Sequence, residues 1–319
     1  MNNFETISYF LFFISISFIS CAQEPLSDTI DHCLFHHTEP LSDHDTLLYD
    51  TGMGVTQWRV QGPDYKYPQF NPSNMNEIAF IKSYDLWLFD MCAGEKYLVQ
   101  DDVSFLWDWS KRDWLLITKR DRNLYKIKSN GDSLTLLNAG GFNTYATWNP
   151  AGDKFMFLDN NSGVPLMDIN GNRIDTMRLA PYGADWYAED RVVSEYDNKI
   201  RMYDLSNNTS FLLDYTPYSF SYATISNTRY VPEKEMVIWD SDEYIFSTDI
   251  DTKERSIIKK GSHSQVYHEF DISADYSTIV TIRSDMTSSP DILYIVEERK
   301  HLCLMSIDGT HERRILLDW

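Results

Sequence analysis

The stretch YATWNPAGDKFMFLDN, Tyr145 to Asn160, combines an aromatic residue, a tight turn containing Pro150 and Gly152, and a short apolar run. The run KFMFL has the length and composition of a β-strand. Related stretches recur along the chain at intervals of 39, 39, 38, 39 and 47 residues. Their anchor positions are Phe70, Trp109, Trp148, Trp186, Ile225 and Ile272. A period near forty residues suits one four-stranded blade, so the stretch indicates one copy of a repeated unit.

Each period has the same internal order. After the anchor come a polar turn, an apolar run such as EIAFI or TIVTI, and a third run such as DLWLFD or NLYKIK. Asn130-Gly131, Asn170-Gly171 and Asp308-Gly309 then supply residues that tolerate the positive φ of tight hairpins. No window has a sustained helical period. The sequence therefore predicts an all-β fold, a six-bladed β-propeller of four-stranded antiparallel blades.

These motifs resemble the TolB-like six-bladed propellers, whose WD40-like (PD40) repeats carry a W-S-P-D-G-like turn, then I-A-F, then a D-L-Y-V-M-D-like strand. The resemblance extends from roughly Tyr65 to the C-terminus and is clearest in FNPSNMNEIAF, WSKRDWLLI and WNPAGDKFMF. It implies a rigid disc that binds partners in the cell envelope. TolB has a further N-terminal α/β domain for which this chain has no residues, so we do not expect a direct role in the Tol system.

Two strand-like runs, DTLLYD and VTQWRV, precede the first full unit. They either add an outer strand to the last blade and help to close the ring, or form a degenerate seventh blade. We assign residues 46–319 to the propeller domain. The last unit carries an insertion, SDMTSSPDILYIVEERK, between its second and third strands.

The N-terminus has the features of an export signal. Residues 1–20 contain an apolar or hydroxyl run from Ile7 to Ser20, and Cys21 follows in FISCAQ. This resembles the lipobox of bacterial lipoproteins, which implies lipidation of Cys21; an ordinary cleaved signal is the alternative. We expect a protein of the cell outer membrane or periplasm, attached through lipid at Cys21, with 21–45 as a flexible tether.

The other cysteines are Cys33, Cys92 and Cys303, whose number and wide spacing argue against a scaffold built on disulfides. Cys33 lies in HCLFHH with His36 and His37, residues that suit zinc or copper. No second ligand pair follows at finger-like spacing, so we interpret this cluster as incidental.

A net charge of −20 makes nucleic acid and anionic lipid surfaces poor partners. A cationic, neutral or metal-bridged partner fits better, and we expect a monomer. The sequence contains no G-x-S-x-G elbow, phosphate loop or dinucleotide motif, which disfavours the enzymes that use them.

Tryptophans form two groups. Those at the anchors occupy one repeat position, which predicts packing between blades. Trp87, Trp107, Trp114 and Trp239 lie outside that register; they are the better candidates for an exposed aromatic platform, although a place in the core is the favoured interpretation for them too.

The segment SHSQVYHEF leads into the last anchor and holds the candidate ligand-binding residues Gln265, His268 and Glu269, with His263 beside them. Loops that enter an inner strand open onto one mouth of the channel. The segment resembles the ligands that oligogalacturonate lyases bring to that mouth, which implies a manganese site with Gln265 and His268; Phe270 stands where that family has a further histidine. Beyond this divalent metal we expect no cofactor.

Two functions follow from the sequence. The favoured one is a non-catalytic, lipid-anchored binding module that engages an envelope protein, peptide or glycan. The alternative is a metal-dependent polysaccharide lyase or another glycan-active enzyme with its site at the channel mouth.

Overall fold

The structure is a computed structural model that describes Cys33 and residues 37–41, 57–60, 62–139, 143–159, 163–177, 182–196, 199–215, 227–241, 244–262, 265–288 and 295–317. The expected signal peptide and Cys21 lie outside these residues. Within them, no helix combines the length and the apolar character that crossing a membrane requires.

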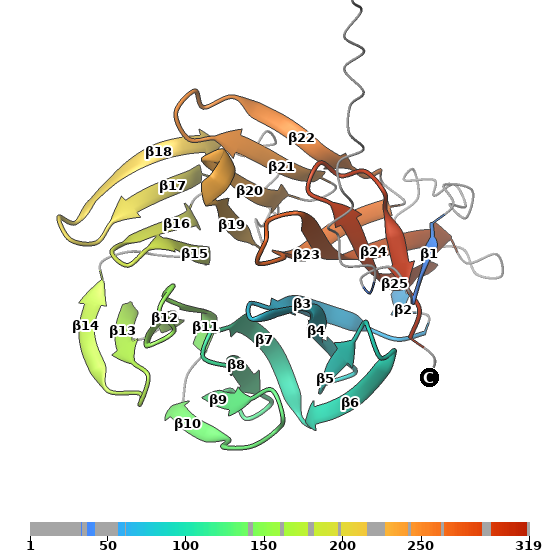
Figure 1. The fold of residues 1–319 in the computed structure, drawn as a ribbon, viewed down its shortest axis with the longest axis horizontal. Helices are drawn as coiled ribbons and strands as arrows, with labels where there is room; N and C mark the ends of the chain where they lie inside the picture. The colour runs from blue at the N-terminus through green and yellow to red at the C-terminus, as the bar shows by residue number, and fades with distance from the viewer. Residues whose placement is uncertain are drawn as a thin grey trace, which may run out of the picture.

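Six antiparallel sheets are arranged around a central axis like the blades of a propeller (Figure 1). The first three blades are β3 to β6 (Tyr65–Asn71, Asn74–Lys82, Asp85–Asp90, Glu95–Gln100), β7 to β10 (Val103–Trp109, Trp114–Lys119, Leu124–Lys128, Thr135–Asn138) and β11 to β14 (Asn143–Trp148, Lys154–Asp159, Val164–Asp168, Arg173–Met177). The fourth is β15 to β18 (Tyr182–Ala188, Arg191–Tyr196, Lys199–Asp204, Thr209–Tyr215). The fifth is β19 to β22 (Thr228–Val231, Met236–Ser241, Tyr244–Asp249, Arg255–Lys260), with a 3-10 turn η3 at Pro232–Lys234. The sixth is β23 to β26 (Gln265–Ile272, Thr278–Ser288, Ile295–Ser306, Arg313–Ile315). The predicted six-bladed propeller of four-stranded blades is therefore confirmed.

Local sequence explains the hairpins within each blade. Gly131 and Gly171, in the predicted Asn-Gly turns, have φ values of 87° and 85°. At Gly131 a side chain would also meet the carbonyl oxygen of Val99 on the preceding blade, 3.0 Å from an added Cβ. A glycine at this turn thus serves both the hairpin and the close approach of two blades.

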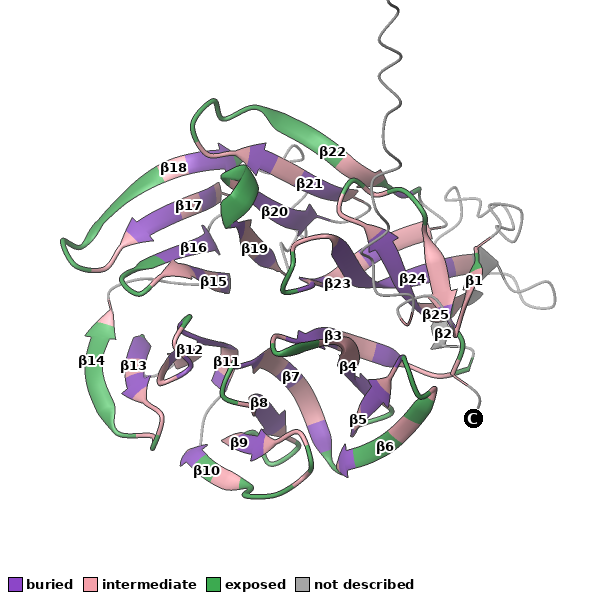
Figure 2. Ribbon diagram, in the orientation of Figure 1, coloured by how far each residue is buried: buried purple, intermediate pink, exposed green. Residues whose placement is uncertain are grey.

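The core lies between neighbouring blades. Burial falls from the inner and middle strands toward the outer strands, and β6, β14, β18 and β22 carry most of the exposed residues of the strands (Figure 2). The anchors Trp109, Trp148 and Trp186 are only 4%, 4% and 6% exposed and belong to these inter-blade clusters. Their predicted role in packing is confirmed.

Two additional strands complete the last blade. β2 (Gln57–Val60), from the run VTQWRV, pairs in parallel with β25, and the sixth-blade insertion extends the β24–β25 hairpin beside it. β1 (Thr38–Pro40) pairs antiparallel with β26 as the outermost strand. The run VTQWRV therefore adds a strand to the last blade, as one of the two alternatives predicted, but the outermost strand comes from Thr38–Pro40, in the segment expected to be a tether. The run DTLLYD lies outside the described residues.

The segment that contains β1 spans the seam between the first and last blades. Cys33 forms a disulfide with Cys92, in the turn between β5 and β6 of blade one. The ring of His37 contacts Phe89 of the same blade, whereas its carbonyl accepts a bond from Leu316 N of blade six. Because Cys33 is oxidised, its sulfur is not a thiolate metal ligand. The sequence argued against a scaffold built on disulfides, and it did not predict this single bond, because positions distant in the sequence meet at the seam of the ring.

Candidate functional site

Each inner strand places the residue before its anchor at the centre of the ring. Asp108, Asp185 and Asp271 hold this position in blades two, four and six, and each accepts a hydrogen bond from a backbone N–H of the next blade. The donors are Trp148 N (2.7 Å), Tyr230 N (3.1 Å) and Phe70 N (2.8 Å), respectively. Blades two, four and six are thereby joined to blades three, five and one.

This pattern identifies Tyr230 as the anchor of the fifth blade, because Tyr230 N makes the same bond as the anchors Trp148 and Phe70. The predicted anchor, Ile225, is therefore wrong by five residues and lies outside the described part of the chain. The shift makes Arg229 the residue before the anchor in blade five. The six equivalent positions are Gln69, Asp108, Thr147, Asp185, Arg229 and Asp271.

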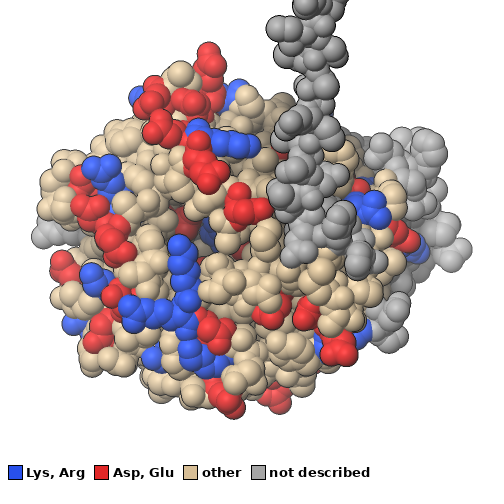
Figure 3. Space-filling model, in the orientation of Figure 1, with Lys and Arg blue, Asp and Glu red and all other residues tan. Residues whose placement is uncertain are grey.

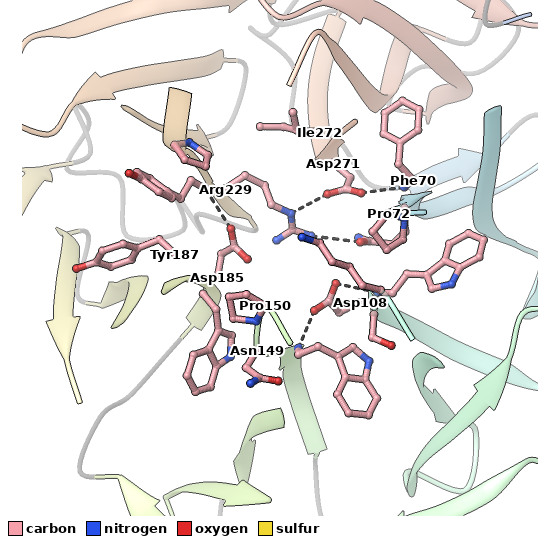
Figure 4. A pocket seen from close by; sticks show the side chains of 18 of the residues that line it. Phe70, Pro72, Asp108, Asn149, Pro150, Asp185, Tyr187, Arg229, Asp271 and Ile272 are labelled. Atoms are coloured by element: carbon pink, nitrogen blue, oxygen red, sulfur yellow. Dashed lines mark hydrogen bonds and ion pairs between the residues drawn. The ribbon is translucent and has the colours of Figure 1, made fainter. Parts of the chain in front are cut away.

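One end of the channel, which we call the acidic mouth, is a cavity of about 310 Å³ lined by Asp108, Asp185, Asp271, Arg229 and the anchor tryptophans. Figure 4 shows the carboxylates of Asp108, Asp185 and Asp271 converging on the guanidinium of Arg229 from different blades. In the space-filling view, acidic and basic side chains are mixed over the face of the disc, which is hollowed near its centre (Figure 3).

Arg229 uses all three of its nitrogens within the protein. Nε donates to Asp271 Oδ1 at 2.7 Å, Nη2 donates to Gln69 Oε1 at 3.3 Å, and Nη1 donates to the carbonyl of Thr228 at 3.1 Å. The Arg229 and Asp271 side chains are 13% and 11% exposed, so the ion pair is largely shielded from solvent. Arg229 also lines the cavity at the other end, which places it at the narrow middle of the channel.

Burial and neighbouring charges change the pKa values of the side chains at the acidic mouth. It raises the pKa of Asp185 to about 6, although the positive charge of Arg229 opposes the rise. Burial also raises the pKa of Asp108, again against the effect of Arg229. Burial alone would lower the pKa of Arg229, but Asp271, Asp185 and Asp108 raise it, so the guanidinium stays charged.

The opposite end, which we call the aromatic mouth, is a cavity of about 150 Å³ where the inner strands begin. Four aromatic side chains from three consecutive blades line it: Tyr67, Phe105, Trp107 and Tyr145. Phe105 and Trp107 are stacked, with ring centroids 4.8 Å apart, and Trp107 lies 5.6 Å from Tyr145 and 6.0 Å from Tyr67. The rings form a continuous, partly exposed wall.

The backbone at this mouth has an unusual conformation. Tyr67, Tyr145 and Glu269, each three residues before an anchor, have φ values of 52°, 54° and 53°. Each lies at a register shift between the first and second strands of its blade. Positive φ in residues other than glycine costs on the order of 1 kcal/mol, and such residues concentrate at functional sites. The bulges therefore mark this mouth as a candidate site.

Glu269 is the carboxylate of the aromatic mouth. Its Oε2 accepts a hydrogen bond from Tyr67 N at 2.8 Å, which joins blade six to blade one. Burial raises the pKa of Glu269 to about 7, although the Tyr67 bond and the charges of Lys300 and Lys66 oppose the rise. This side chain is therefore partly protonated near neutral pH.

The three predicted ligand-binding residues have different surroundings. Of these, Glu269 alone is among the residues that line the aromatic mouth. His268 Nε2 lies 2.8 Å from Ser284 Oγ, and burial, with a contribution from Lys300, lowers the pKa of His268 to about 4. Gln265 lies beside Tyr267 and Arg283, and its amide oxygen accepts from Arg283 Nε at 3.0 Å when turned toward the guanidinium. Among the described residues, no group of three or more His, Cys, Asp and Glu side chains could hold a metal ion.

The candidate platform tryptophans also differ from one another. Trp107 lines the aromatic mouth, as that interpretation requires. Trp87, Trp107 and Trp114 are partly buried and pack against core clusters, and Trp239 is fully buried, so the core interpretation is confirmed for Trp239. The ammonium groups of Lys126 and Lys128 lie over the ring of Trp114.

Sequence analysis missed the residues of the channel centre. The pairs Asp108-Trp109, Asp185-Trp186 and Asp271-Ile272 repeat an aspartate directly before the anchor, and this was the available signal. Arg229 had no such signal, because the fifth anchor was misplaced.

The chain matches no protein-family model and no curated protein sequence. Among solved structures it is similar to an oligogalacturonate lyase in complex with manganese, with 12% identity, a TM-score of 0.49, and coverage of 79% of this chain and 76% of that one. A chain of the mitotic checkpoint complex has 10% identity and a TM-score of 0.51, with coverage of 88% and 95%. At these identities the likeness concerns the fold alone.

Proposed function

We propose that this protein is a non-catalytic binding module, and that the aromatic mouth is where it receives part of a partner protein or peptide. The observation that carries this proposal is the convergence of Tyr67, Phe105, Trp107 and Tyr145 around one cavity. Partly exposed aromatic rings held by strained backbone supply rigid contact area at a low entropic cost.

The chemistry of the mouth favours binding over glycoside hydrolysis. Hydrolysis of a glycosidic bond ordinarily needs two carboxyl groups across the bond. Among the described residues that line this cavity, Glu269 is the one carboxylate. The hydroxyl and amide groups that line the same cavity do not replace an acid and base pair.

The lyase alternative has one observation in its favour, which is the raised pKa of Glu269. A carboxyl group with a pKa of about 7 is suited to proton abstraction near neutral pH. Incubation with oligogalacturonate and detection of unsaturated products by ultraviolet absorbance tests it. Product formation that is lost in Glu269→Gln would replace the binding proposal with this one.

We further propose that the module is a TolB-like lipoprotein of the cell envelope, attached through Cys21. The repeat motifs and the lipobox-like FISCAQ support this, and so does the Cys33–Cys92 disulfide, because such bonds persist in oxidising compartments. Metabolic labelling with radioactive palmitate in a bacterial host tests the anchor. Label in the wild type that disappears in Cys21→Ala is expected; equal label in both proteins would contradict it.

The binding proposal is tested by capture of partners from solubilised envelopes with the immobilised protein. Trp107→Ala should lose the captured partner, whereas Trp114→Ala, which removes a tryptophan of the same blade outside the mouth, should retain it. Circular dichroism checks that both variants are folded. Equal capture by Trp107→Ala and the wild type would overturn the assignment to this mouth.

A further inference from the structure

We propose that the group received by the aromatic mouth is an organic cation, namely the ammonium or guanidinium end of a lysine or arginine side chain on the partner. This inference rests on the proposed function and specifies the chemistry of the ligand at the same site.

The walls of the mouth suit a cation. Rings of Tyr67, Phe105, Trp107 and Tyr145 lie with neighbouring centroids between 4.8 and 6.0 Å apart. The faces of such rings attract ammonium and guanidinium groups, by about 0.5 to 2 kcal/mol for each well-placed ring. An aromatic wall alone would also accept a neutral apolar group, so a second feature is needed to decide.

That feature is the carboxylate of Glu269. Its Oε2 is bonded to Tyr67 N, and its Oε1 has no partner among the described residues, although the side chain lines the cavity. A partly buried carboxylate without a cationic partner is costly to ionise. A ligand cation would remove this cost by forming a charge-assisted hydrogen bond with the available oxygen.

The basic residues near Glu269 have other partners. Lys66 Nζ lies 2.8 Å from Asp64 Oδ2, and Lys300 Nζ lies 2.9 Å from Asp64 Oδ1. Arg229 is bonded to Asp271, Gln69 and a backbone carbonyl. Each of these three cations is therefore held by another acceptor, which leaves the Glu269 carboxylate to the ligand.

The charge around the mouth also favours a cationic ligand. Asp108, Asp185 and Asp271 outnumber Arg229 at the centre of the channel, Asp240 lies near Glu269, and the whole chain carries a net charge of −20. An anionic ligand would be repelled both by this negative potential and by Glu269, whereas a cation is attracted by both.

The aromatic mouth is the smaller of the two channel cavities. Its volume of about 150 Å³ is about half that of the cavity at the acidic mouth. A cavity of this size, open at one end, suits the end of a single side chain of the partner.

Calorimetric titration tests the inference with choline and its uncharged isostere 3,3-dimethylbutan-1-ol, and with N-acetyl-lysine amide and N-acetyl-norleucine amide. Each cation should bind at least about tenfold more tightly than its neutral match. Glu269→Gln should weaken choline binding by about tenfold, whereas Asp185→Asn, which removes a carboxylate of the acidic mouth, should not. Equal affinity for charged and neutral probes, or loss of binding only in Asp185→Asn, would overturn the inference.

Its failure is distinguishable from failure of the proposed function. Capture of a partner that depends on Trp107, together with no preference for the charged probes, would reject the cation and retain the binding module. Capture that is independent of Trp107 would reject the binding site itself.

Discussion

Both mouths of the channel are formed by the inner strands of the repeats, but their side chains make different contacts. At the acidic mouth, Asp108, Asp185 and Asp271 accept backbone N–H groups of neighbouring blades, and Asp271 also binds Arg229. Earlier on the inner strands, the aromatic mouth presents partly exposed rings and, at Glu269, a carboxylate with an available oxygen. The carboxylates of the acidic mouth therefore join neighbouring blades, whereas the rings and the second carboxylate oxygen of the aromatic mouth remain accessible to the proposed ligand.

This comparison shows why charge alone does not identify a site. The acidic mouth has the larger cavity and more charged groups, but those groups are hydrogen-bonded within the protein. Substitutions at the acidic mouth should consequently change stability, whereas substitutions at the aromatic mouth should change binding.

The largest effect is expected for Asp271→Ala. It leaves the shielded guanidinium of Arg229 without its carboxylate and removes the acceptor of Phe70 N. Breaking such a pair from one side should lower the free energy of unfolding by about 3 to 5 kcal/mol. Urea denaturation followed by tryptophan fluorescence measures this.

Two further variants complete that experiment. Asp153→Ala, which breaks the exposed pair with Arg112 at 3.8 Å, should cost less than about 1 kcal/mol. Arg229→Met combined with Asp271→Leu should be less destabilised than Asp271→Ala, because the shielded guanidinium is removed together with its ion-pair partner. An Asp271→Ala variant as stable as Asp153→Ala would contradict the structural role of the acidic mouth.

The second prediction concerns Glu269→Gln and pH. Because the pKa of Glu269 is raised from 4.5 to about 7 on folding, the folded protein retains a proton that the unfolded chain releases. The free energy of unfolding of the wild type should thus decrease between about pH 4.5 and 7, by on the order of 3 kcal/mol from this group. Glu269→Gln lacks this contribution, so its stability relative to the wild type should improve as pH rises.

Denaturation of both proteins at pH 5 and pH 8 measures the difference, and other titrating groups largely cancel because both proteins contain them. Saturation with choline should reduce the decrease in the wild type, since the bound cation favours the ionised carboxylate. A stability difference that is the same at both pH values would mean that Glu269 is ionised throughout.

The sequence predicted the blades well because their signals are local. The turn after each anchor and the apolar second strand lie within about a dozen residues, so the anchors Trp109 and Trp148 were found at the ends of their inner strands. The disulfide between Cys33 and Cys92 could not be predicted in this way, because ring closure, and not sequence spacing, brings these cysteines together.

The candidate site was predicted only in part for a similar reason. Glu269 was selected with Gln265 and His268 because they are close in sequence, but a strand alternates its side chains and the bulge at Glu269 changes that alternation. Tyr67 and Tyr145 were missed because their role depends on three blades meeting at the axis. Because the fifth anchor was predicted five residues too early, Arg229 was not recognised as a residue of the channel. Its register follows only from the hydrogen bonds of the fifth blade.

A third prediction separates hydrogen bonding from charge at Asp185. Asp185→Asn keeps an oxygen acceptor for Tyr230 N, whereas Asp185→Ala leaves that N–H without its partner. We expect Asp185→Ala to lower the free energy of unfolding by about 1 to 2 kcal/mol at pH 7, and Asp185→Asn by less. Thermal or urea unfolding measures both, and equal losses would assign the effect to charge.

The smallest effect on stability is expected at the aromatic mouth, for Tyr67→Asn. Asparagine tolerates the φ of 52° better than tyrosine, which offsets part of the loss of ring contacts with Phe105 and Trp107. The free energy of unfolding should change by less than about 1 kcal/mol, while choline binding weakens several-fold because one aromatic face is lost. Tyr84→Asn, at an exposed tyrosine with a φ of 71°, is the matched control and should leave binding unchanged. A Tyr67→Asn variant that is strongly destabilised, with wild-type affinity at low temperature, would show that the rings of this mouth hold the propeller together as the carboxylates of the other mouth do.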